Sequence, residues 1–434
     1  MYGVFSIALT VLGIVSGSFF LFSIGFTKYY QDRYERDLFA TTVTILAIGL
    51  VLSCLALLPV DIFLVSSTVN LQTGLKYEWA TPEAIDKMKF VVQLIYYVCY
   101  GLISVFCFFL IPFTYFYYEE DIEQTTNERI RGAFKYTSFF IIISILLFLF
   151  ALFLKPNNPP PKIDLDWLRE LLTETNGEKT LAFIIGCLAV LGMLIFIGYT
   201  APGLSLFPIG LIKGRTKLQV ENDDVENQLV VVRERQRELQ AKYVGNNKVM
   251  TSQDYRQMEN LEDEERILLR RLRGIEEDKN STWQKILIWL RPFEMIIGIL
   301  LFFLTLVIMI SMFLSIVDKI SSSICGQQCG YIISHPKIFN PINFIFVNLS
   351  KWFPLDYIFM VLLIIYYFMA TVSGLIHIGI RFLWITLFKI RKHGTSPQGL
   401  LVTAILLTLS LLGLNYTVTT TVAPGYAHFG SQVY

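Results

Sequence analysis

Charged residues are scarce in this chain. Only 16% of its 434 residues are Asp, Glu, Lys or Arg, whereas an ordinary soluble domain carries about 25%. Apolar residues make up 54%, against about 45–50% in soluble proteins, so the chain has more apolar surface than a water-soluble fold buries. The 36 basic and 35 acidic residues nearly cancel. This balance argues against a nucleic-acid-binding protein, because such proteins are usually basic overall.

Motifs for catalysis and nucleotide binding are also missing. The sequence has no GxxxxGK[ST] phosphate loop, no HExxH zinc motif and no GxSxG nucleophile turn. Its four histidines are scattered along the chain. We therefore expect no enzymatic activity, no built-in cofactor or metal, and no ATP hydrolysis by the chain itself.

What the chain has instead is a series of long, nearly uncharged segments. A hydrocarbon core about 30 Å thick takes about 20 helical residues, and these runs are apolar on all sides rather than alternating as membrane strands do. Helices also satisfy their own backbone hydrogen bonds, as hydrocarbon requires. The sequence thus predicts an all-α, polytopic integral membrane protein with eight transmembrane helices, approximately at residues 2–26, 40–65, 90–116, 134–154, 181–212, 286–317, 357–380 and 400–422.

The orientation follows from the positions of Lys and Arg in short loops, since cytosolic loops carry more of them. The loops after the first, third and seventh helices carry a denser set than the loops on the other side. A luminal N-terminus is therefore predicted. The dense set comprises Lys28, Arg33, Arg36, Arg129, Arg131, Lys135, Arg381, Lys389, Arg391 and Lys392.

Residues 214–283 differ from the rest of the chain, with 13 basic and 15 acidic residues. Apolar residues recur there every three or four positions, as in an amphipathic helix. A Gly245-Asn246-Asn247 break divides the pattern in two. We predict a cytosolic charged helical hairpin at 214–283, between membrane helices 1–5 (residues 1–213) and 6–8 (residues 284–434).

Two short patterns in this hairpin resemble cytosolic sorting signals. Tyr255 and Met258 fit a Tyr-x-x-bulky signal, and Glu264 with Leu268 and Leu269 fits an acidic dileucine. A clathrin adaptor would be the partner that reads them. The alternative is that the same residues belong to the apolar stripe and pack inside the hairpin.

Few ionisable residues lie in the apolar segments. Asp61, Glu294, Asp356 and His377 all fall near segment ends, where they act as interfacial anchors or, because such residues are costly in a membrane, mark function. Helix breakers are more frequent in these segments than ionisable residues. Pro59, Pro112, Pro202 and Pro208 lie within or at the ends of the segments. Gly203 makes the end of the fifth segment the expected unwound region, and broken helices often hold transporter substrate sites. Gly13 and Gly17 form a GxxxG, a pattern that permits close helix contact but often occurs by accident.

Cysteines are few, and four of the six (Cys54, Cys99, Cys107 and Cys187) lie in apolar segments as expected packing residues. Cys325 and Cys329 share a loop that the topology places in the lumen. This pair is a candidate disulfide in an oxidising compartment. Asn348 heads an Asn-x-Ser sequon on the same side and is a candidate glycosylation site of a glycoprotein.

Several short runs stand out at or near the ends of the apolar segments. The runs are Leu58–Ser66 with Pro59 and Asp61, Ile111–Phe113 with Pro112, Phe116–Glu120 with Glu119 and Glu120, Leu211–Gly214 after Pro208, Phe353–Ile358 with Asp356, Ala423-Pro424, Tyr426 and Gly430–Gln432. Together these runs resemble one family, the limb region-like (LMBR1-like) membrane proteins, and among them the lysosomal cobalamin transporters. The similarity extends over essentially the whole chain.

The resemblance implies a multi-pass lysosomal membrane protein that is needed to move cobalamin (vitamin B12) as cargo to the cytosol. It also implies an ABC-type lysosomal transporter as partner, which would supply ATP hydrolysis. The alternatives are a direct conduit for cobalamin, or a plasma-membrane receptor that binds clathrin adaptors. The resemblance supplies no cobalamin-contacting residue. Its members typically have nine spans, so this sequence, with eight, is expected to be a fragment, a truncated gene model or a shorter variant.

Overall fold

The computed structural model describes residues 2–32, 37–68, 76–119, 125–153, 176–213, 216–244, 252–280, 291–322, 337–350, 352, 354–382 and 385–428. These residues form two compact units. Unit 1 comprises Met1–Leu206 and Thr305–Tyr434, and unit 2 comprises Phe207–Leu304. Each unit is described by itself.

The described residues are almost entirely helical. Eight helical stretches are long and apolar enough to cross a membrane, which confirms the predicted number of spans. These spans are Phe5–Tyr30, Leu38–Val65, Pro82–Glu119, Thr126–Leu147, Phe183–Lys213, Phe293–Ser322, Leu355–Ile378 and Pro397–Val422.

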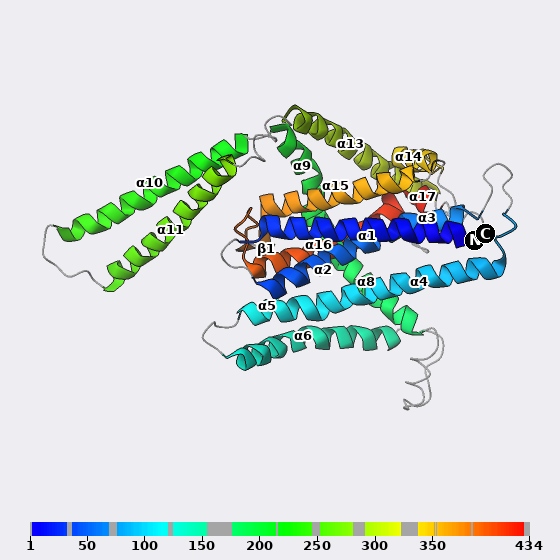
Figure 1. Ribbon diagram of the computed structural model, residues 1–434, viewed down its shortest axis with the longest axis horizontal. Helices are drawn as coiled ribbons and strands as arrows, with labels where there is room; N and C mark the ends of the chain where they lie inside the picture. The colour runs from blue at the N-terminus through cyan, green and yellow to red at the C-terminus, as the bar shows by residue number, and fades with distance from the viewer. Residues whose placement is uncertain are drawn as a thin grey trace. The chain divides into compact units, whose positions relative to one another are not determined.

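The spans are assembled from the following helices, labelled as in Figure 1: α1 (Tyr2–Tyr30), α2 (Leu38–Leu55), α3 (Leu57–Ser66), α4 (Pro82–Val105), η1 (Phe106–Leu110), α5 (Ile111–Glu119), α6 (Thr126–Phe153), α8 (Asn176–Ile195), η2 (Phe196–Thr200), α9 (Ala201–Lys213), α13 (Arg291–Ser322), α15 (Leu355–Ile378), α16 (Pro397–Thr417) and η4 (Val418–Val422). Two short helices, α14 (Pro341–Leu349) and α17 (Pro424–His428), and one antiparallel hairpin, β1 (Ile380–Phe382) with β2 (Ile385–Phe388), complete unit 1.

The core of unit 1 is built around the second, seventh and eighth spans. Between 67% and 72% of the residues in their most apolar windows are buried inside the protein, whereas the other five spans reach only 11–28%. The helix α16 packs against α2, α5, α8 and α15, and α1 packs along α2 (Figure 1). The outer spans are therefore the ones whose apolar side chains are left to face lipid.

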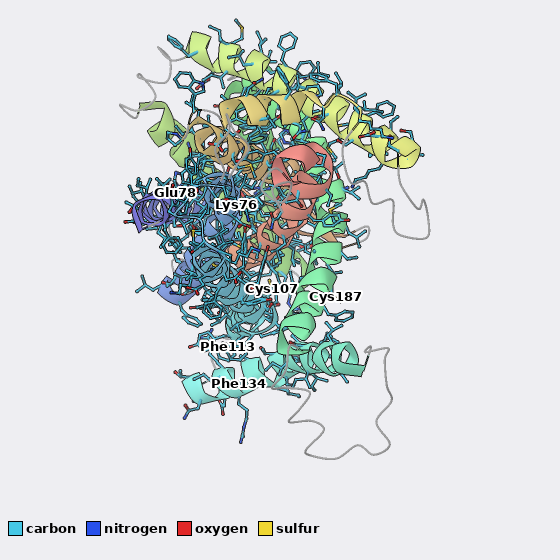
Figure 2. All side chains as sticks on the ribbon, turned by 90° about the vertical axis from the view of Figure 1, so that its right-hand side faces the viewer. Lys76, Glu78, Cys107, Phe113, Phe134 and Cys187 are labelled. Carbon is cyan, nitrogen blue, oxygen red and sulfur yellow. The ribbon has the colours of Figure 1, made fainter. Side chains whose placement is uncertain are left out.

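Aromatic contacts join the helices at the edge of this unit. Phe113 on α5 lies against Phe134 on α6, with ring centroids 4.9 Å apart (Figure 2). The same view labels Cys107 on η1 and Cys187 on α8. The four cysteines in the described spans carry free thiols, and Cys54 and Cys107 are buried.

Three spans contain a widened, π-helical turn at the same distance from a proline. In each, the residue immediately before the proline donates its backbone N–H to the carbonyl five residues earlier: Ile111 to Phe106, Ala201 to Phe196, and Ala423 to Val418. Proline lacks an N–H, and its ring clashes with the carbonyl four residues back in a regular helix. A π turn relieves that conflict while the chain stays hydrogen-bonded.

This geometry corrects the expectation of an unwound region at the end of the fifth span. The chain there is continuously helical through η2 and α9, with Pro202 just after the π turn and Pro208 inside α9. The prolines do mark a local irregularity, but it takes the form of a wider turn rather than a break. The second span, by contrast, is interrupted at Ala56, between α2 and α3 and three residues before Pro59.

In unit 2, α10 (Thr216–Val244) and α11 (Ser252–Asn280) pack their apolar stripes against each other. Val225, Leu229, Val232 and Leu268 form the buried core of the pair. The Nε of Arg233 lies 2.8 Å from Oε1 of Glu265, and this hydrogen bond lowers the pKa of that carboxyl. Tyr243 donates a further hydrogen bond to Asp254 across the pair. The cytosolic placement of this helix pair stays a prediction.

Candidate functional site

Three hydroxyl groups meet where the fifth, seventh and eighth spans come together. The hydroxyl of Thr200, in η2, lies 2.9 Å from that of Thr371 on α15 and 2.8 Å from that of Ser410 on α16. All three side chains are buried. We call this group the hydroxyl cluster. Each hydroxyl both donates and accepts, so the cluster satisfies polar groups that would otherwise be costly in an apolar interior.

Glycines bring the backbones of the same helices into direct contact around the cluster. A Cβ on Gly192 of α8 would lie 2.1 Å from the carbonyl oxygen of Leu409, and one on Gly413 would lie 2.8 Å from Gly192 itself. On the α15 side, a Cβ on Gly203 or Gly374 would lie 1.9 Å or 2.0 Å from a backbone oxygen. Small residues permit such approaches between membrane helices, and here they fix α8, α9, α15 and α16 together.

A second buried polar contact lies on α13. The hydroxyl of Thr305 is 2.5 Å from that of Tyr366 on α15, and both lie within hydrogen-bond distance of the backbone carbonyl of Leu204, at 3.1 and 3.2 Å. The fifth span, which precedes α10 and α11, and the sixth span, which follows them, are therefore joined within unit 1.

The end of unit 1 that contains α14 and α17 is held by Asn340. Its side chain caps α14 by accepting from the backbone N–H of Asn343 at 2.9 Å. Its Nδ2 donates to Ser315 Oγ on α13 at 2.7 Å and to the carbonyl of Val422 at 3.1 Å. Ser311 donates a further hydrogen bond to Asn340. One buried amide thus connects α13, α14 and the end of the eighth span.

Asp356 lies at the same end, in the first turn of α15. Its side chain is buried, and Oδ2 accepts a hydrogen bond of 3.1 Å from the hydroxyl of Tyr426 on α17. The Tyr426 ring stacks on Phe346 of α14, with centroids 4.4 Å apart. Burial and the neighbouring carboxylate raise the pKa of Tyr426. Asp356 Oδ1 has no hydrogen-bond partner among the described residues.

Comparison with known proteins identifies the family. Residues 6–271, more than half of the chain, match the LMBR1-like membrane protein family. The chain belongs to the LMBR1-like membrane proteins. It is 40% identical to a protein of Sclerotinia sclerotiorum over 94% of this chain and 72% of that one, and 41% identical to a protein of Aspergillus terreus over 93% and 73%. A third relative, from Emericella nidulans, is 40% identical over 99% of this chain and 78% of its own length.

The three relatives carry the same name, "Probable lysosomal cobalamin transporter". No solved structure matches the chain. The family assignment therefore rests on sequence similarity.

The LMBR1-like motifs that are far apart in the sequence gather at the two ends of unit 1. At one end, Tyr357 donates to the carbonyl of Ala56, two residues before the Leu58–Ser66 run begins, and Asp356 binds Tyr426. Pro59 is buried and Asp61 is half-buried on α3. These contacts give the run around Asp356 and the Ala423–Tyr426 run a structural role, closing one end of the bundle.

The Pro112 and Glu119 motif lies towards the other end. Pro112 is buried just after a π turn, and Glu119 is exposed at the end of α5. The neighbouring carbonyl of Tyr118 accepts a hydrogen bond of 3.1 Å from Gln398 of α16. Glu120 lies outside the described residues.

The candidate sorting residues are divided between the surface and the interior of the helix pair. Tyr255 is 63% exposed and Glu264 is exposed, whereas Leu268 is only 4% exposed and Met258 and Leu269 are half-buried. All five lie on α11. A protein that reads the dileucine pattern would first have to separate α11 from α10, so the packing alternative accounts for Leu268.

The remaining predicted residues are placed as follows. Cys325 and Cys329 lie outside the described residues, so the disulfide stays a prediction. Asn348 lies half-buried near the end of α14. Within the described parts of the chain, no group of three or more His, Cys, Asp or Glu side chains is arranged to hold a metal ion.

No sequence motif predicts the hydroxyl cluster or the glycine contacts. Single Thr and Ser residues carry no motif, and their partners are up to 210 positions away along the chain. The GxxxG pattern at Gly13 and Gly17 has open space at the Cβ positions of both glycines. A usable signal was the Gly374 and Gly413 pair inside otherwise apolar segments, since glycine is costly in a helix unless close packing requires it.

Proposed function

We propose that this protein is a lysosomal membrane protein required for the export of cobalamin from the lysosomal lumen to the cytosol. The observation that supports it is the identity of 40–41% with relatives named probable lysosomal cobalamin transporter, over 93–99% of this chain. The eight membrane-spanning helices fit a multi-pass protein of that kind.

The experiment that tests this proposal is deletion of the gene, followed by measurement of lysosomal and cytosolic cobalamin. We expect cobalamin to accumulate in lysosomes and to fall in the cytosol, with recovery on re-expression of the wild-type chain. Normal cytosolic cobalamin after deletion would contradict the proposal.

We further propose that the protein acts as the escort and partner of an ABC-type transporter rather than as the conduit. Two features support this. The buried hydroxyl of Thr200 bonds to those of Thr371 and Ser410, so these groups hold helices together instead of offering donors to a large polar cargo. The charged helix pair α10–α11 presents an exposed polar surface, as expected for contact with another protein.

Escort and conduit make opposite predictions for the purified protein. Reconstituted in liposomes, an escort shows no cobalamin uptake above empty vesicles, whereas a conduit does. In cells that lack the protein, an escort leaves the ABC-type partner outside lysosomes. Cobalamin uptake by the purified protein alone would contradict the escort role while leaving the requirement for cobalamin export intact.

The N-terminus is proposed to face the lumen, because the basic loops then face the cytosol. With that orientation, Asp61, Asp356 and the α14–α17 end of unit 1 lie on the luminal side, and β1–β2 lies on the cytosolic side.

A further inference from the structure

One end of unit 1 has a concentration of positive charge at the level where three spans end. The helix α1 ends at Tyr30, α15 ends at Ile378 and α16 begins at Pro397. Residues 379–395, which join α15 to α16 through β1 and β2, contain four Lys and Arg residues, one His and no Asp or Glu. We call them the basic connection. Figure 1 shows β1 at the end of unit 1 opposite the label of the N-terminus.

Main-chain hydrogen bonds join the basic connection to the end of α1. The N–H of His393 donates to the carbonyl of Tyr29 and that of Thr395 to the carbonyl of Tyr30, both at 3.1 Å. In return, the N–H of Asp32 donates to the carbonyl of Thr395 at 3.1 Å. His393 adopts a positive φ of 51°, a conformation that non-glycine residues seldom take. The part of the connection around His393 and Thr395 is thus held in one conformation at the end of α1.

A side-chain bond within the connection fixes the position of Arg391. The hydroxyl of Thr395 donates to the Arg391 carbonyl at 2.8 Å, and the Arg391 N–H approaches the same hydroxyl oxygen at 3.0 Å. In the β hairpin, Ile380 pairs with Phe388 and Arg381 pairs with Thr386, and Lys389 directly follows β2. The hairpin therefore holds Arg381 and Lys389 within one short, paired connection.

The cations of this region are directed to the surface. Arg381, Lys389 and Arg391 are exposed, and among the described residues no carboxylate lies within ion-pair distance of them. Lys392 Nζ lies over the Tyr29 ring, 5.0 Å from its centroid, and Lys28 is exposed one residue before that ring. Asp32 is the acidic residue that the hydrogen bonds bring to the connection, so positive charge dominates.

The position of these charges relative to the membrane indicates which ligand they contact. Ends of membrane-spanning helices lie at the headgroup level, and polybasic segments directly beside such ends attract anionic lipids. Leu387, 54% exposed between the cations, supplies an apolar contact next to them. Arginine binds phosphate with two parallel hydrogen bonds. We propose that the basic connection, together with Lys28, binds the phosphate groups of anionic phospholipids.

A tendency of cytosolic loops to be basic explains the number of cations but not their arrangement. A topology signal requires only positive charge near a span. It does not require a left-handed His393, a bond network to α1, or a lysine placed over Tyr29. An acidic protein segment is the competing ligand, and it is disfavoured because the site lies in the plane of the headgroups.

The test uses the full-length protein in neutral detergent, with phosphatidylinositol 4-phosphate as the added lipid and phosphatidylcholine as the neutral comparison. Bound lipids are counted by native mass spectrometry. The variants are Arg391→Gln and the double variant Lys389→Gln/Arg391→Gln. The matched control is Lys87→Gln, an exposed lysine at the start of α4, near the end of unit 1 where Figure 2 shows Lys76 and Glu78.

We expect the wild-type protein to retain the anionic lipid in preference to phosphatidylcholine, with retention falling as salt rises. Each cation removed should lower the apparent affinity about fivefold, as expected for about 1 kcal/mol per charge at an anionic surface. Lys87→Gln should retain the lipid as well as the wild type does. All variants should have the unfolding temperature of the wild-type protein.

Three results would overturn the proposal. The first is equal retention of the anionic lipid by wild type and the double variant. The second is an equal loss in Lys87→Gln. The third is complete competition by soluble inositol 1,4-bisphosphate at the concentration of the lipid itself, since the ligand would then be a free phosphate compound rather than a membrane lipid.

Discussion

Thr200 shows how single polar residues organise an apolar interior. Its hydroxyl bridges Thr371 and Ser410, so one side chain on the fifth span contacts the seventh and the eighth. In hydrocarbon such bonds have modest net value, because the unfolded chain in the membrane also finds partners. They nevertheless fix which faces of the helices meet.

We predict that Thr200→Val and Ser410→Ala each lower stability by roughly 1 kcal/mol. Their combination should show a coupling of about 0.6 kcal/mol, because either change removes the same bond. A double-mutant cycle on unfolding in mixed micelles measures it. Thr10→Val is the control, since Thr10 is exposed and bonds only to the carbonyl of Ser6 in its own helix. Strict additivity would contradict the predicted contact.

At the scale of helices, close approach depends on glycine. The Cβ of an alanine at position 192 would lie 2.1 Å from the Leu409 carbonyl oxygen, a distance that backbone movement alone can relieve. Overpacking of this kind typically costs about 1–3 kcal/mol. The contact between α8 and α16 is therefore set by the absence of a side chain.

We predict that Gly192→Ala lowers the unfolding temperature, whereas Gly186→Ala on the same helix does not. Nothing lies within 4 Å of the Cβ position at Gly186, and alanine is favoured over glycine in a helix by about 1 kcal/mol. The pair of variants separates helix propensity from packing. An equal response at both positions would show that α8 and α16 are not in backbone contact.

The stability of the helix pair α10–α11 comes from an apolar core and from an ion pair at the border of that core. The Glu265 carboxyl, whose pKa is lowered by Arg233, contributes stability while it is ionised. That contribution is present at neutral pH and is lost as the pH falls through the lowered pKa. Because Arg233 is half exposed, the pair is worth only about 0.2–1 kcal/mol.

We predict that acidification increases hydrogen exchange in α10 and α11 of the wild type more than in Arg233→Ala. The arginine variant lacks the interaction that lowers the pKa of the Glu265 carboxyl, so protonation of that carboxyl removes less stability from it. Leu268→Ala should raise exchange at every pH by removing a core side chain, at a cost of about 2–5 kcal/mol. An identical pH response in wild type and Arg233→Ala would contradict the role of the pair.

At the scale of the whole molecule, the ends of unit 1 have different characters. One end is closed by Asn340, Asp356 and Tyr426, and the other carries the basic connection. The distribution of charge predicts that the basic end faces the cytosol.

This orientation is tested with single cysteines in sealed organelles. We predict that Lys392→Cys reacts with a membrane-impermeant maleimide and that Glu78→Cys reacts only after the membrane is permeabilised. Both variants are made in a Cys325→Ser/Cys329→Ser background, because the topology places these two cysteines in a luminal loop. The four cysteines in the described spans lie within helices, which limits their labelling. The reverse pattern of labelling would invert the predicted topology.

The sequence by itself determined the class of fold, the eight spans and the division into membrane helices and a charged segment. These features depend on the length, apolar content and charge of local stretches, and each membrane helix satisfies its own backbone hydrogen bonds. The prolines also mark local irregularities, yet a proline in an apolar segment is compatible with either a π turn, as found before Pro202, or an unwound stretch.

Only the tertiary structure decided which helices are central and which residues meet. The hydroxyl cluster, the Gly192 contact and the bond between Asp356 and Tyr426 join positions that are far apart in the chain. Inside a bilayer the apolar faces of helices are all similarly attractive to lipid. Partner choice therefore depends on shape and on a few polar atoms, and these become visible only when the helices are packed.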